Sequence, residues 1–390
     1  YNRRADATAP NPPRHGGPTD TGLPGEARRW RDPRTQAQWD WEGVDADWTY
    51  ADAWTLLGQA LRKSRAKIAQ PVHVPDAPPP PGQLGQGKED RPALWRWQPE
   101  HRVHAVVGEL AARSMVHDKV VYLVDVPSAA ARRAPRSVSL HPVMDLKIDM
   151  TAIDQPAQID KVLRAAVERE DRLPEILSQA NDIDLFFESI TGVSPGAAPL
   201  AYQLLDVAQT WAHQLLMVLK NQIAQRRPVE VSGSVMPVIA TPGHGSLPSG
   251  HATIAALTAA LWSELLYDSS HAGQPRVGEL DRLARRIAFN RVVAGVHFPV
   301  DSVVGYRLGT QLARCFIALA GVGAQFVPQM VTTEDALIDP ARAHHDPGVP
   351  ELLERGLPCS ANHNTQSLEP APQLALLYAR AADELALIRI

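Results

Sequence analysis

Residues 197–226 read AAPLAYQLLDVAQTWAHQLLMVLKNQIAQR and form the longest helical pattern in the chain. Their large apolar side chains recur at the spacing that one buried helix face requires. These positions are Leu204, Leu205, Trp211, Leu215, Leu216, Leu219 and Ile223. Proline lacks the backbone N–H that a helix interior needs, so we expect this helix to end before Pro228. A buried helix of this length favours a fold of packed helices.

Further helical patterns follow and precede this one, whereas alternating strand patterns are scarce. We therefore expect an all-α fold, a helical bundle with a long irregular N-terminal arm and loops. The predicted helices span residues 99–124, 156–181, 182–193, 250–267, 277–292, 301–320 and 372–387. The helix over 99–124 has a second element at its end, and the helix over 156–181 is broken or kinked at Pro174.

The composition of the chain changes twice along its length. Residues 1–92 are rich in proline, glycine and charge, and we expect an extended arm with one helix at 48–69 and a proline-rich linker at 70–92. Residues 93–325 form the predicted helical-bundle catalytic domain. Residues 326–390 form an irregular tail whose final helix packs on the bundle.

The overall composition indicates a soluble protein, with 21% charged and 44% hydrophobic residues among 390. A net charge of −4 gives no general attraction to nucleic acid or anionic membranes. No segment reaches the ~18–20 apolar residues that span a bilayer. The first residue is Tyr1, which leaves open whether a leader precedes it and which compartment holds the protein. The helical faces and long arm make a homodimer or larger homo-oligomer the expected assembly.

Three short clusters carry the candidate chemistry, and the first is a pair of cations. Lys220 and Arg227 are seven residues apart, so on a helix both side chains leave the same face. Two stacked cations in an apolar helix favour a nearby anion or acid. The alternative is an ordinary basic helix C-terminus, which the helix dipole stabilises.

The second cluster is SLPSGH at residues 246–251, which stands just before an apolar run. Ser249 suits the N-cap of a helix, and Gly250 lets a ligand approach the backbone closely. Free N–H groups at a helix start bind anions. An ordinary N-cap would explain Ser249, but it does not explain His251.

The third cluster, NRVVAGVHFPVD at residues 290–301, contains Arg291, His297 and Asp301. An aspartate four residues after a histidine can accept a hydrogen bond from one ring nitrogen and leave the other as ligand or nucleophile. A buried His–Asp pair without chemistry remains the alternative. Taken together, the three clusters predict a pocket for a tetrahedral oxyanion.

These motifs resemble the superfamily that vanadium-dependent haloperoxidases share with type 2 phosphatidic acid phosphatases. The resemblance covers about residues 211–315, and all three motifs occur in the family's order. It implies a helical bundle and an oxyanion held by the residues of the three clusters. These implied binding residues are Lys220, Arg227, Ser249, Gly250, Arg291 and His297.

The resemblance also implies individual roles. His297 would be the axial ligand of vanadium in vanadate, or the phosphorylated nucleophile of a phosphatase. His251 would be the general acid and base, and Asp301 would orient His297. Lys220 would polarise the bound peroxide. His244, seven residues before His251, resembles a second histidine beside the site of bromide-oxidising members.

We expect a haloperoxidase with vanadate as its cofactor and with hydrogen peroxide, a halide (bromide foremost) and a small organic acceptor as substrates. About two hundred residues precede the first motif, as in haloperoxidases, and Asn290 stands where phosphatases usually carry serine. The alternative is a soluble acid phosphatase that forms a phosphohistidine. A non-catalytic helical scaffold is a further alternative, against which the complete set of basic residues argues.

Overall fold

Two units make up the chain, Tyr1–Asp90 and Arg91–Ile390. The predicted helix at 48–69 and the linker at 70–92 lie outside the described residues. In the first unit, β1 (Arg29–Arg31) pairs antiparallel with β2 (Gln38–Asp40). The residues that the computed structural model describes are 29–31, 38–40, 94, 97–124, 140–267, 275–322, 325–337 and 366–388.

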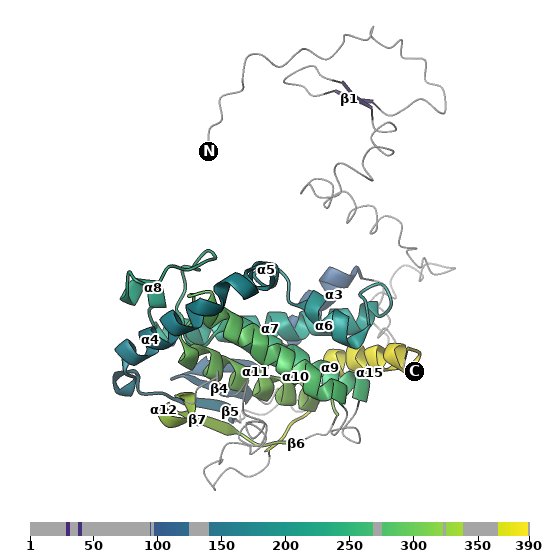
Figure 1. The fold of residues 1–390 in the computed structure, drawn as a ribbon. Coiled ribbons are helices and arrows are strands. Elements are labelled where there is room, and N and C mark those ends of the chain that lie inside the picture. Colours follow the sequence, from purple (N-terminus) through teal and green to yellow (C-terminus); the bar gives the residue numbers. More distant parts are fainter. Residues whose placement is uncertain are drawn as a thin grey trace, which may run out of the picture. The chain divides into compact units, whose positions relative to one another are not determined.

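Helices make up most of the second unit, as the periodicity predicts (Figure 1). Their bounds are α3 (Pro99–Ala111), α4 (Gln155–Ala165), α5 (Arg169–Gln179), α6 (Asp184–Thr191), α7 (Pro199–Ile223), α8 (Pro228–Val231), α9 (Gly250–Tyr267), α10 (Pro275–Val293), α11 (Pro299–Leu319), α12 (Thr333–Ala336) and α15 (Pro372–Ala386).

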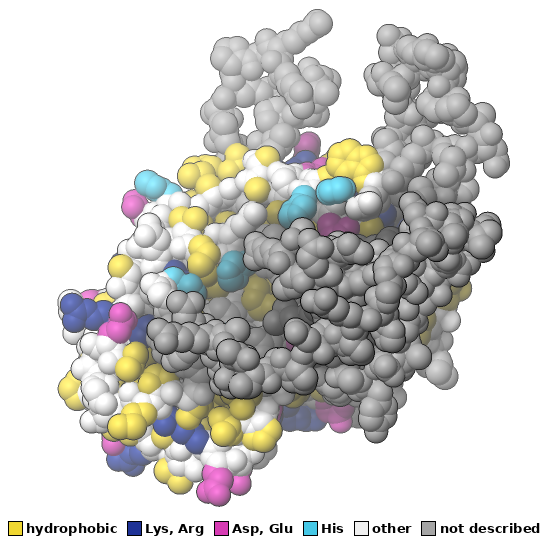
Figure 2. All heavy atoms as spheres, turned by 90° about the horizontal axis from the view of Figure 1, so that it is seen from above, with side chains coloured by type: hydrophobic (Ala, Val, Ile, Leu, Met, Phe, Trp, Pro, Cys, Tyr) yellow, Lys and Arg dark blue, Asp and Glu magenta, His cyan; other side chains and the backbone are white. Residues whose placement is uncertain are grey.

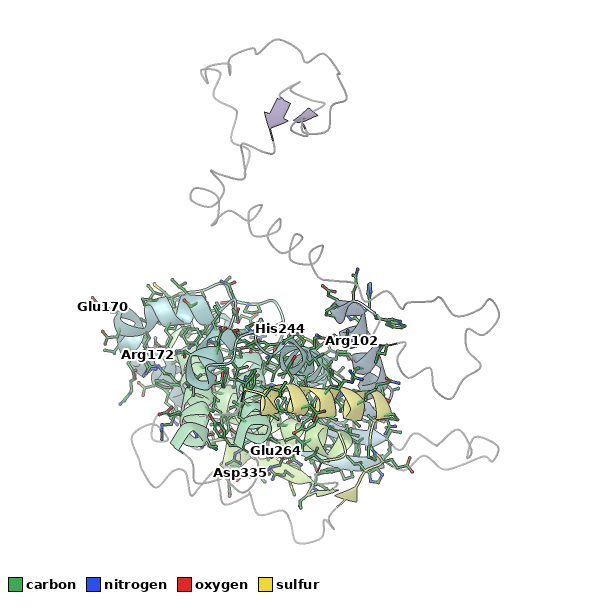
Figure 3. The ribbon with its side chains drawn as sticks, turned by 90° about the vertical axis from the view of Figure 1, so that its right-hand side faces the viewer. Arg102, Glu170, Arg172, His244, Glu264 and Asp335 are labelled. Atoms are coloured by element: carbon green, nitrogen blue, oxygen red, sulfur yellow. The ribbon has the colours of Figure 1, made fainter. Side chains whose placement is uncertain are left out.

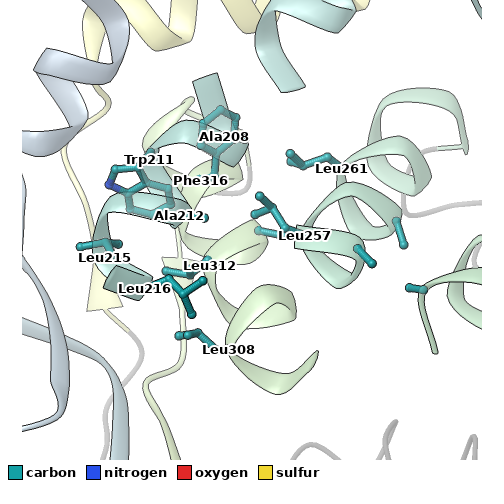
Figure 4. Close-up of a cluster of buried hydrophobic side chains, with 14 of the residues drawn as sticks. Ala208, Trp211, Ala212, Leu215, Leu216, Leu257, Leu261, Leu308, Leu312 and Phe316 are labelled. Carbon is teal, nitrogen blue, oxygen red and sulfur yellow. The ribbon is translucent and has the colours of Figure 1, made fainter. Parts of the chain in front are cut away.

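Helix α9 is the centre of the bundle and packs against α7, α10 and α11. Because neighbours surround it, α9 is apolar on almost every side, and its leucines meet those of α7 and α11 (Figure 4). Trp211 of α7 packs against Phe316 of α11 with ring centroids 6.1 Å apart and the ring planes tilted by 40°. Each fully buried leucine or phenylalanine contributes about 1.5–3 kcal/mol. Among the described residues, no helix is long and apolar enough to cross a membrane.

The expectation of a purely all-α fold is wrong, because a four-stranded sheet flanks the bundle. Its order is β3-β4-β5-β7, with β7 parallel to β5 and the other pairs antiparallel. The turn between β3 and β4 uses Asp118 and Lys119 with positive φ and carries no glycine that would signal a hairpin. The strand bounds are β3 (Ser114–His117), β4 (Val120–Val124), β5 (Leu140–Lys147) and β7 (Gln329–Thr332).

Three smaller corrections concern element boundaries. The helix expected over 99–124 ends at Ala111, where the hairpin follows. The helix expected over 156–181 is interrupted at Ala166–Glu168 by a 3-10 turn, while Pro174 lies in the middle of α5. Proline in a helix interior lacks a backbone donor and its ring crowds the carbonyl four residues earlier, yet α5 continues past Pro174 to Gln179. The predicted irregular tail also contains β6 (Gln325–Phe326), paired with β8 (Gln366–Ser367).

The exposed surface mixes side-chain types. Figure 2 shows histidine and hydrophobic side chains standing side by side on the face seen from above. Trp97, half-exposed, and Met236 are among the large hydrophobic side chains that reach solvent. Single exposed apolar side chains of this kind are ordinary on a protein surface.

Two glycines of α11 let it approach α9 more closely than a side chain would permit. A Cβ on Gly309 would lie 2.1 Å from the carbonyl oxygen of Thr253. One on Gly305 would lie 2.5 Å from the carbonyl oxygen of Ser249. Both neighbours are backbone atoms, which cannot turn away as a flexible side chain can. The close approach of α11 to α9 therefore includes Ser249, which belongs to the second motif.

We expect Gly309→Ala to destabilise the protein by about 2 kcal/mol or more, because α9 and α11 must separate. The matched control is Gly108→Ala in α3, where a Cβ would meet nothing within 4 Å. There the better helix propensity of alanine should stabilise by about 0.5–1 kcal/mol. Urea unfolding of both variants measures the difference, and a Gly309→Ala variant as stable as wild type would contradict the close contact.

Candidate functional site

The three motif clusters meet at one buried place, where the ends of several helices come together. Lys220, near the end of α7, is buried, and its Nζ donates to the carbonyl oxygens of Gly245 at 2.8 Å and Ser246 at 3.0 Å. Burial, with Arg227 nearby, lowers the pKa of Lys220 to about 7. The first motif is thus tied directly to the segment that leads into the second.

Arg227 connects the second and third motifs. Its Nη1 donates to the carbonyl oxygen of Val296 at 2.8 Å and lies 3.1 Å from Nε2 of His297. Its Nη2 lies 3.1 Å from Nδ1 of His244, which is exposed and is labelled in Figure 3. Because a guanidinium can only donate, Nε2 of His297 is an acceptor in this contact.

His297 is fixed by Asp301, the pairing that the sequence predicts. Nδ1 of His297 lies 3.1 Å from Oδ2 of Asp301, and both side chains are buried. The same oxygen accepts hydrogen bonds from the backbone N–H of Phe298 at 2.9 Å and from the hydroxyl of Ser246. Burial lowers the pKa of His297 to about 3, although Asp301 opposes this. His297 is therefore a neutral ring with its proton on Nδ1 and a lone pair on Nε2.

His251 lies on the first turn of α9. Its Nε2 is 2.9 Å from the carbonyl oxygen of Gln179 and must donate to it, so Nδ1 of the neutral ring is a proton acceptor. Burial and the charge of Arg291 lower the pKa of His251 to about 4, while the Gln179 carbonyl opposes the shift. At neutral pH the ring is uncharged and able to take a proton.

Arg291, fully buried near the end of α10, has unused hydrogen-bonding capacity. Its Nη2 donates to the carbonyl oxygen of Ile176 at 3.2 Å and to Oε1 of Gln179 at 3.3 Å. Its Nε and Nη1 are buried without a partner. Burial lowers the pKa of Arg291 only to about 10, so the side chain stays charged. Buried, charged and unpaired donors are costly unless an anion meets them.

Ser249 and Gly250 occupy the start of α9, as the sequence predicts. Ser249 is buried, its N–H donates to the carbonyl oxygen of Asp301 at 2.9 Å, and its Oγ lies 3.5 Å from the N–H of Ala252. A Cβ on Gly250 would lie 3.3 Å from the Leu216 side chain, so close packing on α7 is a second reason for glycine there.

The structure brings together all the residues that the motifs named and adds others that sequence reasoning missed. Ser246 donates to Asp301, Gln179 contacts both His251 and Arg291, and Asn290 donates to Gln179 at 2.9 Å. Ser246 lies in the second motif, where the sequence indicated only a turn residue. Gln179 comes from a distant amphipathic helix, and no local pattern marks it.

Ser246→Ala removes one of three donors to the buried Asp301 carboxylate. We expect a loss of about 1.5–3 kcal/mol in unfolding free energy, since the acceptor is charged. The control is Ser302→Ala, equally buried, whose hydroxyl donates to the neutral carbonyl oxygen of Ala288 at 3.0 Å. The Ser302→Ala variant should lose only about 1 kcal/mol in unfolding free energy. Equal losses in chemical denaturation would show that Asp301 gains nothing special from Ser246.

Comparisons with known proteins agree with this geometry. The PAP2 superfamily model matches residues 204–321, which contain all three motifs. No curated protein matches the chain. Among solved structures, one is the first transmembrane PAP2-type phosphatidylglycerolphosphate phosphatase from Bacillus subtilis. It shows 22% sequence identity, covers 41% of this chain and 83% of its own, and has a TM-score of 0.33.

The superfamily includes both phosphatases and haloperoxidases, and its members are generally enzymes. With a TM-score of 0.33, the likeness to this structure carries no argument about which of these activities the chain has. The family match is stronger because it spans the segments whose side chains meet at the buried site. By this match, residues 204–321 form a PAP2 superfamily domain within the chain.

Proposed function

We propose that the protein is a vanadate-dependent haloperoxidase that oxidises a halide, bromide foremost, with hydrogen peroxide. The observation that carries this choice is His251, a neutral proton acceptor held beside three buried basic side chains. Deprotonation of hydrogen peroxide needs such a base at neutral pH. A leaving-group acid would need the opposite protonation state.

The residues present fit vanadate. Nε and Nη1 of Arg291 are buried donors without partners, and the neutral His297 offers Nε2 as a ligand atom. Arg227 would exchange its contact with His297 for one with the oxyanion, and Lys220 would add positive charge. Vanadate, when bound, supplies the electrophilic centre at which peroxide becomes reactive toward halide. Ser249 and Gly250 would contribute the start of α9.

Two further side chains act on the substrates in this proposal. Nδ1 of His251 takes the proton of the incoming peroxide, and the Gln179 carbonyl keeps the opposite nitrogen protonated throughout. His244 contacts Arg227 from the exposed side of the site, where a halide and a small organic acceptor would arrive. Fixed positive charge at this point favours the approach of an anion.

A second candidate is phosphoester hydrolysis, and the comparisons lend it more weight than they lend halide oxidation. Nε2 of His297 would attack phosphorus, forming an N–P bond as the ester P–O bond breaks. His251 would give its proton to the departing alkoxide, and water would then cleave the N–P bond. This route requires a protonated His251, whose pKa the bound phosphate would have to raise well above 4.

The decisive assay follows bromination of an activated diketone with peroxide and bromide, with and without added vanadate. We expect vanadate to switch the activity on, and His297→Ala to lower it by about a hundredfold or more. His104→Ala, which removes an exposed histidine of α3, should leave the rate unchanged. Hydrolysis of p-nitrophenyl phosphate that vanadate inhibits, with no bromination, would reject the haloperoxidase in favour of the phosphatase.

The pH dependence separates the two chemistries by its sign. A base must be neutral, so halide oxidation should rise with pH through the pKa of His251, which is about 4 without bound anion and higher with it. Hydrolysis that uses His251 as an acid should fall over the same range. Steady-state kcat measured from acid to neutral pH distinguishes them. A bromination rate that declines with rising pH there would rule out His251 as the base.

A further inference from the structure

The last turn of α5 holds two groups of the oxyanion site at once. The main-chain carbonyl of Gln179 accepts from Nε2 of His251 at 2.9 Å. Its side-chain Oε1 accepts from Nη2 of Arg291 at 3.3 Å, and the carbonyl oxygen of Ile176 accepts from the same nitrogen at 3.2 Å. A helix C-terminus leaves its last carbonyl groups without intrahelical partners, so the Gln179 carbonyl is free for this use. The Ile176 carbonyl also accepts the backbone N–H of Ala180 at 3.1 Å and is therefore shared.

Gln179 is itself held rigidly. Its side chain is fully buried, and its Nε2 donates to Oε1 of Glu175 at 2.8 Å, which fixes the orientation of the amide. Oε1 also accepts from Nδ2 of Asn290 at 2.9 Å, and Oδ1 of Asn290 accepts from Arg172 (Figure 3) at 2.9 Å. Every polar atom of the Gln179 amide therefore has a partner.

The amide is also electrically suited to its place. The nearest carboxylate, Glu175, forms a two-oxygen contact with Arg286 at 2.7–2.9 Å, so its charge is already compensated. Gln179 stands between Glu175 and Arg291 as a neutral acceptor. A carboxylate at position 179 would hold the guanidinium more strongly, but it would also cancel the charge that an anion needs.

We propose that Gln179 is a positioning residue for oxyanion binding, which directs Nε and Nη1 of Arg291 into the pocket without neutralising the guanidinium. The proposal rests on the proposed oxyanion site, whether vanadate or phosphate occupies it. Because the amide and Ile176 engage only Nη2, the two remaining donors of Arg291 stay unpaired. Asn290 supports the same amide, which gives a physical role to that position beside Arg291.

The test is isothermal titration calorimetry of the full chain at pH 8, which measures its affinity for orthovanadate and, separately, for inorganic phosphate. Gln179→Leu should bind each anion about tenfold or more weakly, because the guanidinium loses its acceptor. Gln179→Glu, nearly isosteric, should bind still more weakly, because its carboxylate pairs with Arg291. A role in packing alone predicts the reverse order, with the isosteric variant close to wild type.

The matched control is Gln311→Leu. Gln311 is equally buried on α11, but its Nε2 donates to the carbonyl oxygens of Val143 and Val327, beside the sheet. The Gln311→Leu variant should bind both anions with the affinity of wild type. Thermal unfolding verifies that each variant is folded. Should Gln179→Leu fail to fold, Gln179→Glu alone decides the matter, and binding equal to wild type overturns the proposal.

The two possible failures are distinguishable. If wild type binds neither anion, the oxyanion site itself is wrong, and the role of Gln179 falls with it. If wild type binds the anions and Gln179→Leu has an affinity within about twofold of wild type, only the role of Gln179 is refuted. The loss of one hydrogen bond to a charged group would lower the affinity by more than that.

Discussion

The close contact between the first turn of α9 and α11 is the constraint on which the rest of the site depends. Gly305 leaves room for the backbone of Ser249, whose N–H donates to the carbonyl oxygen of Asp301. Helix α9 carries His251, and the start of α11 carries Asp301 beside His297. This one contact therefore fixes the position of the two histidine-bearing segments relative to each other. Any larger residue at Gly305 would push apart the groups that make the pocket.

Charge is the second organising feature. Lys220, Arg227 and Arg291 are buried together, while Asp301 is the carboxylate that touches the site directly through His297. Burial disfavours the charged forms, which is why the pKa of Lys220 falls to about 7 and that of Arg291 to about 10. A tetrahedral oxyanion would relieve this cost, so the desolvation of these basic side chains would contribute to affinity for the anion.

One arrangement of side chains thus suits two reactions of the PAP2 superfamily. In the two proposed reactions, both would use the neutral Nε2 of His297 and the positive charge around it, and they would differ in what His251 does. The carbonyl at the end of α5 fixes the tautomer of that ring, and burial with Arg291 sets its protonation. Under the proposed function, the choice between the two chemistries would depend on the environment of the His251 imidazole, which includes a helix outside the three motifs.

The sequence by itself determined the long helices and the motif residues, because helical periodicity and the spacing of Lys220, His251 and His297 are local properties. It did not determine the sheet, whose strand β7 joins from a distant segment, nor the partners Gln179 and Ser246, which act through space. Only the tertiary structure decided those, since a hydrogen bond between residues 55 or 112 positions apart leaves no pattern in either segment. Burial, the largest cause of the lowered pKa values of Lys220, His251, Arg291 and His297, is likewise a property of the packed chain alone.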